Sequence, residues 1–231
     1  MNQQVLKRLI LSHESFLVKI YNFFGLNRKR FRGERNKLMI KGFLKKNRIN
    51  VIGRENEVYV EGGLTRLSEC RITIYGSNNK IIIGRHVVLD GVTLYIEDDN
   101  NTISIGDDTW INRNVELATI EGTAIKIGND CMFSSNIFLR TGDSHSILNA
   151  TSGLRINPSR DIELGNHVWV GNGARILKGA RIGDNCIIST GAIVTGKEFP
   201  ANSVLAGIPS KVIKSSISWD RSRKIEFEKN N

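Results

Sequence analysis

The feature that most constrains this chain is an aliphatic-glycine dipeptide that recurs with a small or β-branched residue three places after the glycine. The clearest copies are Ile83-Gly84-Arg85-His86-Val87, Ile105-Gly106-Asp107-Asp108-Thr109, Ile127-Gly128-Asn129-Asp130-Cys131, Leu164-Gly165-Asn166-His167-Val168 and Ile182-Gly183-Asp184-Asn185-Cys186. In the last copies aliphatic residues return every six positions, a period that fits neither a helix nor strand alternation. Short strands joined by tight corners have this period, so the pattern predicts a β-solenoid whose coils each have three sides.

Two coil lengths follow from the spacing of the repeats. Leu164 and Ile182 are 18 residues apart, whereas Ile105 and Ile127 are 22 apart. The longer spacing predicts four-residue corner extensions at 76–79 and 98–101, where Gly, Ser, Asn and Asp tolerate left-handed backbone. A degenerate coil around residues 52–53 is expected to begin the stack.

The later repeats resemble those of the hexapeptide-repeat acyltransferases. The resemblance covers about residues 52–214 and is strongest at 167–171 (HVWVG), 189–195 (STGAIVT) and 206–212 (AGIPSKV). The pattern most resembles the branch that O-acetylates sugars, which includes maltose, galactoside, capsule and O-antigen acetyltransferases. One departure is Gly196, because the family commonly has Val-Thr-Lys at this step.

The resemblance implies a fold and an activity. The fold is an all-β solenoid, a left-handed parallel β-helix, and the activity is O-acetylation of a sugar or cell-surface glycan by a homotrimer that uses acetyl-CoA. Two alternatives on the same fold are N-acetylation of an amino-sugar nucleotide and O-acetylation of an antibiotic. Acceptor screening with the same cofactor separates them.

An insertion interrupts the repeats between Ile127 and Leu164, which lie 37 residues apart. It predicts a loop at about 140–161 that contains His145. Transfer of an acetyl group to a hydroxyl requires a base with a pKa near neutrality, and imidazole suits this requirement. We expect His145 to be that base, as the resemblance also implies; a solvated loop histidine is the structural alternative. Asp143 is expected either to orient His145 or to serve as a turn residue.

The remaining histidines and cysteines of the repeats have structural explanations. His86 and His167 share the fourth position of their hexads, while Cys131 and Cys186 share the small inward position. Without an exposed nucleophile, direct transfer in a ternary complex is expected rather than an acyl-enzyme. A zinc hydrolyase that resembles β-solenoid carbonic anhydrases needs three histidine ligands. Because His86 and His167 have structural explanations, no metal site is expected. Three cysteines, an odd number without close spacing, favour a reducing compartment, taken to be the cytoplasm.

The resemblance also indicates where cofactor and acceptor bind. The residues that match the cofactor groove are Trp169, Asn172, Gly173, Ala174, Gly191, Ala192 and Thr195. Lys197 and Lys211 are expected to pair with the phosphates of coenzyme A. Asn112 and Asn114 match the place near the acceptor, where neutral amides hold hydroxyls. Small residues and asparagines also serve solenoid corners, and lysines serve solvated surfaces, so a structural role is the alternative for each of them.

The ends of the chain are predicted to lie outside the solenoid. Residues 1–50 contain 13 basic and two acidic side chains and precede a solenoid at 51–214. An amphipathic helix is predicted from the apolar residues Val5, Leu9, Phe16, Ile20 and Phe23. A short C-terminal helix is predicted within residues 215–231.

The basic N-terminal segment allows more than one partner. It fits a helical cap on the first coil, or peripheral contact with the anionic inner face of the cell membrane. Nucleic acid is not expected, because no binding motif accompanies the charge. No signal peptide or membrane-spanning segment is predicted.

Overall fold

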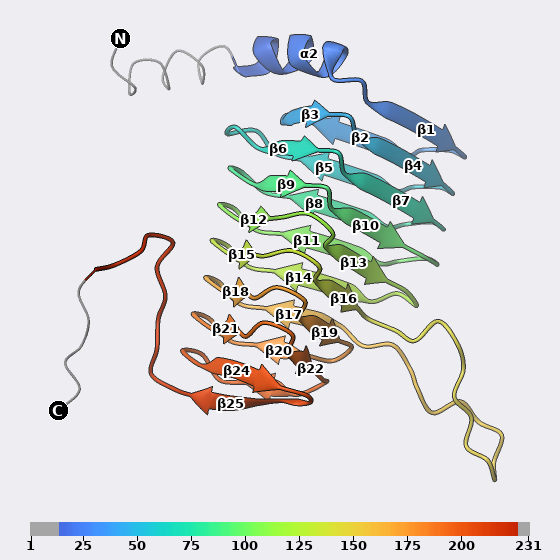
Figure 1. Cartoon of the computed structure of the whole chain (residues 1–231). Helices are drawn as coiled ribbons and strands as arrows, with labels where there is room; N and C mark the ends of the chain where they lie inside the picture. The colour runs from blue at the N-terminus through green and yellow to red at the C-terminus, as the bar shows by residue number, and fades with distance from the viewer. Residues whose placement is uncertain (1–13, 226–231) are drawn as a thin grey trace.

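The computed structural model, which describes residues 14–225, is a left-handed solenoid of parallel strands with a helix at its N-terminal end (Figure 1). The helix is α2 (Glu14–Phe24). Each coil contributes one strand to each of three sheets, which we name A, B and C.

Sheet A comprises, in order, β1 (Arg28–Arg32), β4 (Arg48–Ile52), β7 (Arg71–Tyr75), β10 (Thr93–Ile96), β13 (Glu116–Thr119), β16 (Phe138–Arg140), β19 (Arg175–Leu177) and β22 (Ile193–Val194). Sheet B comprises β2 (Lys37–Ile40), β5 (Glu57–Val60), β8 (Lys80–Ile83), β11 (Thr102–Ile105), β14 (Ala124–Ile127), β17 (Ile162–Leu164), β20 (Arg181–Ile182) and β23 (Glu198–Phe199). Sheet C comprises β3 (Phe43–Lys45), β6 (Arg66–Ser68), β9 (Val88–Asp90), β12 (Trp110–Ile111), β15 (Met132–Phe133), β18 (Trp169–Val170), β21 (Ile187–Ile188), β24 (Val204–Gly207) and the antiparallel β25 (Ser210–Lys214).

The predicted repeat explains the core. The aliphatic residue before each glycine, such as Ile83 and Ile105, points inward and is buried. The cysteines of the small position are buried in the same way. Register follows the repeat, because Ile105 pairs with Ile127 in the longer coils and Leu164 pairs with Ile182 in the shorter ones. Identical inward positions therefore stack into continuous columns along the axis.

The longer coils also contain a ladder of asparagines that the repeat did not predict. Nδ2 of Asn56, Asn79 and Asn101 donates to Oδ1 of the asparagine one coil earlier, at 3.0, 3.1 and 3.3 Å. Asn79 and Asn101 are fully buried. The ladder supplies hydrogen-bond partners for backbone that turns at the extended corners, so it stabilises coils that lack the compact hexad. The neighbouring Asn78 and Asn100 adopt left-handed backbone, as the corner composition predicted.

The predicted start of the solenoid at residue 51 is wrong. Strands β1, β2 and β3 already form one complete coil that pairs with the next, so the stack begins at Arg28. This coil has no aliphatic-glycine signature. At its corner Asn36, the first member of the ladder, accepts hydrogen bonds from the backbone amide and Nδ2 of Asn56. The helix α2 lies across the open end, where Asn22 donates to the carbonyl of Gly42 and accepts from the amide of Leu44. The expected helical cap is therefore present over residues 14–24, while Val5 and Leu9 lie outside the described residues.

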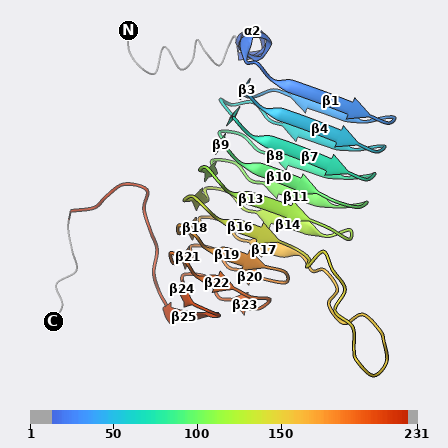
Figure 2. The same cartoon turned by 45° about the vertical axis from the view of Figure 1, so that its right-hand side comes forward.

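The predicted C-terminal helix is absent from residues 215–225. After β25 this stretch runs back along the solenoid in extended form (Figures 1 and 2). Its side chains bind the corner between sheets B and C, where Trp219 stacks on His167 with ring centroids 4.0 Å apart. Contacts with the solenoid therefore replace the internal hydrogen bonds of a helix. Phe227 lies outside the described residues.

Candidate active site

The loop that contains His145 is a hairpin that leaves the solenoid between β16 of sheet A and β17 of sheet B (Figure 2). An antiparallel bridge joins Leu148 to Arg155, and the Ile156 amide donates to the Ile147 carbonyl at 2.9 Å. The spacing of the repeats thus located the insertion, and the structure shows that it is ordered by its own backbone hydrogen bonds.

Asn157 fixes the backbone on both sides of His145. Its Nδ2 donates to the His145 carbonyl at 2.8 Å, and its Oδ1 accepts from the Ile147 amide at 2.8 Å. Asn157 is only 7% exposed, whereas the His145 side chain is exposed and has no hydrogen-bond partner among residues 14–225. The imidazole is therefore free to meet a substrate hydroxyl while its backbone is held.

Asp143 has partners other than His145. Its Oδ2 accepts from Lys178 Nζ and, at 2.8 Å, from Asn157 Nδ2. The Lys178 ammonium and the Asn157 amide hold the pKa of this carboxyl below its ordinary value of 3.8. Asp143 thus joins the base of the hairpin to the next coil, and no contact within residues 14–225 shows it orienting the imidazole. Asp143 lies two positions before His145, which suits both an orienting carboxylate and a turn residue, so the sequence alone could not distinguish these roles.

Two grooves meet at the base of the hairpin. The larger, of about 580 Å³, runs along sheet A and ends at Ser144, the residue before His145. The smaller, of about 380 Å³, contains Asp143 and Thr195 and is also lined by Arg160 and Lys178. The structure therefore brings the hairpin and one predicted cofactor residue together at the corner between sheets A and B.

Arg160 and Lys178 are candidate binding residues that the sequence patterns missed. A Cβ added to Gly179 would lie 3.0 Å from the Arg160 guanidinium, and one added to Gly196 would lie 2.7 Å from it and 2.6 Å from the Lys178 carbonyl oxygen. Gly196, the departure from the family signature, therefore leaves room for this guanidinium. Neither cation belongs to a repeat signature, so only the three-dimensional fold reveals that they face the groove.

The other predicted site residues lie at a different corner, between sheets C and A. Asn112 and Asn114 occupy it after β12, and Asn172, Gly173 and Gly191 occupy it in the later coils. Asn112 and Asn172 donate to the carbonyls of Phe133 and Ser135, at 3.2 and 3.0 Å, as corner asparagines do. Within one chain, sheet A separates these residues from His145.

The remaining predicted cofactor residues are dispersed. Ala174 and Ala192 are buried in the core, which leaves only their backbones for contact with a ligand. Lys197 is exposed beside the smaller groove, Lys211 is exposed on β25, and Trp169 lies beside the C-terminal tail with its ring 6.1 Å from Trp219.

The corner between sheets B and C contains the structural histidines. His86 and His167 both have a φ of 55°, and their Nδ1 atoms lie 3.2 and 2.6 Å from Asp108 and Asp130. Arg221 of the tail adds a bond to Asp130 at 2.8 Å. The repeated geometry agrees with a structural role. Within residues 14–225, no three His, Cys, Asp or Glu side chains form a group that could hold a metal ion.

The cysteines are poorly suited to covalent catalysis. All three are buried and unpaired. Burial raises the pKa of the Cys70 thiol to about 12 and that of Cys131 to about 11, and it raises the pKa of Cys186 as well. Thiolate, the nucleophilic form, is therefore scarce at neutral pH.

The left-handed solenoid and its inserted histidine hairpin define the class of β-solenoid transferases. Residues 161–196 match the family model "Bacterial transferase hexapeptide (six repeats)". The chain is 32% identical to the polysialic acid O-acetyltransferase of Neisseria meningitidis over 173 residues, which are 75% of this chain and 79% of that enzyme. The chain belongs to the hexapeptide-repeat acetyltransferases, in the branch of sugar O-acetyltransferases.

Two further comparisons agree with this membership. The polysialic acid O-acetyltransferase of Escherichia coli O1:K1 is 34% identical over 64% of this chain, a region that spans only 41% of that enzyme. The crystal structure of a polysialic acid-specific acetyltransferase superposes with a TM-score of 0.82, at 30% identity, over 87% of this chain and 92% of that one. The structural likeness includes the N-terminal coils, which the family model does not cover.

Proposed function

We propose that this protein transfers the acetyl group of acetyl-CoA to a hydroxyl of a sugar or cell-surface glycan, with His145 as the general base. The observation that carries the proposal is the ordered hairpin in a chain of this family. It holds beside two grooves a histidine whose side chain has no hydrogen-bond partner within residues 14–225. The imidazole accepts the hydroxyl proton while the hydroxyl oxygen bonds to the thioester carbonyl carbon. The carbon–sulfur bond then breaks, and the proton passes to the departing thiolate.

Transfer is direct, within a ternary complex of enzyme, acetyl-CoA and acceptor. The buried thiols with raised pKa values support this order of events, because none of them is a ready nucleophile. Asp143, in contact with Lys178 and Asn157, acts by keeping the hairpin in place.

The active enzyme is a homotrimer whose sites lie between copies. His145 and Thr195 lie at one edge of sheet A, and Asn112, Asn172 and Gly191 lie at the other, so a neighbouring copy must bring the second edge to the first. The hairpin supports this arrangement, because its apolar residues Ile147, Leu148, Leu154 and Ile156 are 55–69% exposed. In a closed threefold assembly each copy gives its hairpin to one neighbour. Light scattering that finds an active monomer contradicts both the trimer and the shared site.

In this assembly the cofactor lies along the solenoid between copies. We place its pantetheine arm by Trp169, Asn172, Gly173 and Gly191, with backbone contacts at Ala174 and Ala192. Thr195, Lys197 and Lys211 complete the site. Asn112 and Asn114 hold acceptor hydroxyls.

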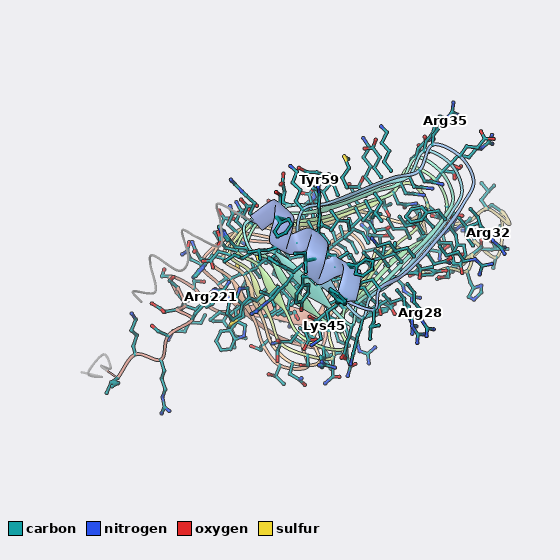
Figure 3. The ribbon with its side chains drawn as sticks, turned by 90° about the horizontal axis from the view of Figure 1, so that it is seen from above. Arg28, Arg32, Arg35, Lys45, Tyr59 and Arg221 are labelled. Atoms are coloured by element: carbon teal, nitrogen blue, oxygen red, sulfur yellow. The ribbon has the colours of Figure 1, made fainter. Side chains whose placement is uncertain are left out.

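The N-terminal end of the solenoid makes peripheral contact with the anionic inner face of the cell membrane. Among residues 14–225 no helix is long and apolar enough to span a bilayer. The helical end nevertheless exposes apolar side chains, since Phe16, Phe23 and Phe24 of α2 and Leu26 just after it are 63–82% exposed. Exposed lysines such as Lys45 lie nearby (Figure 3). An apolar surface with basic neighbours binds anionic lipid by shallow insertion and charge together.

Substitution of Phe23 and Phe24 by Asp tests the membrane contact. We expect the variant to lose sedimentation with vesicles that contain phosphatidylserine while its turnover of a soluble acceptor is retained. Substitution is preferable to deletion of residues 1–48, which removes the whole first coil. Equal sedimentation of both proteins contradicts the contact.

The experiment that tests the activity follows release of coenzyme A thiol with a panel of sugars and glycans. Treatment of the product with hydroxylamine then distinguishes an O-acetyl ester, which is cleaved, from the N-acetyl amide of the alternative function, which is not. Absence of acetyl-CoA turnover with every sugar, amino-sugar nucleotide and antibiotic acceptor contradicts the proposal.

A further inference from the structure

Sheet A carries a set of arginines that differs from the cations of the other faces. Its first three strands present outward Arg28, Arg30, Arg32, Arg48 and Arg71, all exposed. None of these guanidinium groups has a carboxylate partner among residues 14–225. Five like charges on neighbouring strands repel one another, and these three strands contain no acidic residue.

Sheet B of the same coils shows the opposite arrangement. Its Lys37 pairs with Glu57 at 2.9 Å and its Lys41 with Glu61 at 3.4 Å. Paired charges need no external partner, whereas the arginines of sheet A have the capacity to bind anions. Figure 3 shows Arg28 and Arg32 on one long side of the solenoid and Tyr59 of sheet B on another.

The arginines are in register along the axis. Arg28 pairs with Arg48, Arg48 with Arg71, and Arg71 with Thr93, so their side chains form one column. Adjacent parallel strands are about 4.8 Å apart. The column therefore repeats a cation at a short, regular interval, which matches a ligand that itself repeats an anionic group.

The same face leads to the hairpin. A groove of about 280 Å³ is lined by Arg28, Arg30 and Arg48, and the larger groove begins at Arg71 and ends at Ser144. Between these ends the larger groove is lined by hydroxyl and aromatic groups, among them Thr73, Tyr75, Thr93 and Tyr95. An extended molecule on this face therefore reaches from the first coil to the residue next to His145.

Two acidic residues also line the larger groove, and both already have donors. Tyr95 donates its hydroxyl to Glu97 at 3.2 Å, and Arg140 donates to Glu116 at 3.0 Å. Within the described part of the chain, cations without a carboxylate partner thus gather in the first coils of sheet A, and the groove near the hairpin is close to neutral.

We propose that sheet A binds the acceptor as an extended anionic polysaccharide, whose carboxylate groups pair with Arg28, Arg48 and Arg71 while a sugar further along meets His145. This inference rests on the proposed acetyl transfer and adds the class and position of the acceptor. The arginines bind and position the chain, and they take no part in the chemical step. Anchoring several sugars at once raises the concentration of hydroxyl at the site.

The test compares the double variant Arg48→Gln/Arg71→Gln with the wild-type trimer by affinity electrophoresis in gels that contain polysialic acid or dextran. We expect wild type to be retarded by the charged polymer and not by the neutral one. Loss of two charge-assisted contacts should weaken retention about 3- to 10-fold at low salt, with a smaller difference as salt is raised. This binding measurement needs no turnover, so it distinguishes failure of the inference from failure of the proposed activity.

A kinetic measurement accompanies the binding. The double variant should show a higher KM for polysialic acid with an unchanged kcat, since the chemical step is untouched. The matched control is Arg66→Gln, because Arg66 lies in the same coil as Arg48, is exposed and unpaired among residues 14–225, and belongs to sheet C. Its retention and KM should equal those of wild type.

Four results would overturn the inference. They are unchanged retention in the double variant, an equal loss in Arg66→Gln, tighter binding to a single-stranded nucleic acid than to the polysaccharide, and dissociation of the trimer by the double substitution. The last result assigns the arginine face to contact between copies.

Discussion

The coils at the two ends of the solenoid share one three-sided architecture but are stabilised in different ways. Successive coils near the N-terminus are offset by 20, 23 and 22 residues, and their corners are joined by the asparagine ladder. The arginines that their sheet A strands expose have no carboxylate partner among residues 14–225. Coils near the C-terminus have 18-residue spacing and compact hexads, and the family model matches only there. His145 and most of the residues proposed for acetyl transfer lie in or beside the later coils, and the proposed acceptor face lies on the earlier ones. The comparison teaches that the repeat signature marks only part of the solenoid, because the early coils lie outside the matched residues 161–196.

The largest expected effect is the loss of turnover when the proposed base is removed, compared with removal of a structural histidine in an early coil. His145→Ala should lower kcat about 100- to 10,000-fold, because a positioned general base contributes that much, and should leave the fold and the proposed trimer intact. His86→Ala is the matched control, since His86 lies in an early coil and contacts Asp108. Coenzyme A release measured on both proteins decides the matter; a His145→Ala enzyme with half the wild-type rate excludes the proposed base.

The second prediction concerns the ladder that distinguishes the early coils. Asn79→Ala removes the donor to Asn56 and the acceptor for Asn101, and leaves buried polar groups without partners. We expect a loss of about 1–3 kcal/mol in the free energy of unfolding. Urea titration measures it, with Asn78→Gly as control because Asn78 is exposed and its φ of 59° suits glycine. Equal stability of Asn79→Ala and wild type shows that the ladder is dispensable.

A smaller effect is expected at the hairpin as the pH falls. Lys178 and Asn157 lower the pKa of Asp143 below 3.8, so the folded hairpin binds this proton less readily than the unfolded chain does. The stabilisation is therefore present at neutral pH and is lost as the pH falls from about 4 through the lowered pKa. The hydrogen-exchange protection factors of residues 142–161, which correct for the intrinsic pH dependence of exchange, should fall over this range in wild type. In Asp143→Asn the Asp143-dependent part of this fall should be missing; identical profiles refute the role.

The smallest expected effect is a lack of reaction at the cysteines of both regions. Burial and raised pKa values predict that native protein at pH 8 reacts slowly with a thiol reagent, whereas Cys70, Cys131 and Cys186 all react after denaturation. Rapid modification of native protein, coupled to loss of activity, would point to an acyl-enzyme instead.

The sequence predicted the fold wherever inward positions repeat. Ile105 and Leu164 could be placed because every coil demands an aliphatic residue at the same site. The first coil could not, because Asn36 has no aliphatic-glycine neighbours and reveals its role only through its bond to Asn56. The tail was mispredicted because its partner, His167, lies far away in sequence.

The candidate site was predictable only in part for the same reason. The insertion marks its place by interrupting the repeat, so His145 could be selected from sequence. The partner of Asp143 could not, since Lys178 lies 35 residues away and faces the groove only after a coil has closed. Composition likewise cannot show whether a cation has an ion-pair partner. Lys37 pairs with Glu57, whereas Arg48 has no carboxylate partner among residues 14–225.

Because the coils stack at a regular spacing, the number of coils sets the length of the solenoid. Parallel strands fix the rise of a coil at about 4.8 Å, and each coil contacts mainly the two beside it. Duplication or loss of one 22-residue coil between β4 and β12 therefore moves the helical end of the rod away from the hairpin, or toward it, by one step. Gene duplication can thus lengthen or shorten sheet A in fixed increments, without any change in the hairpin or in the coils beside it.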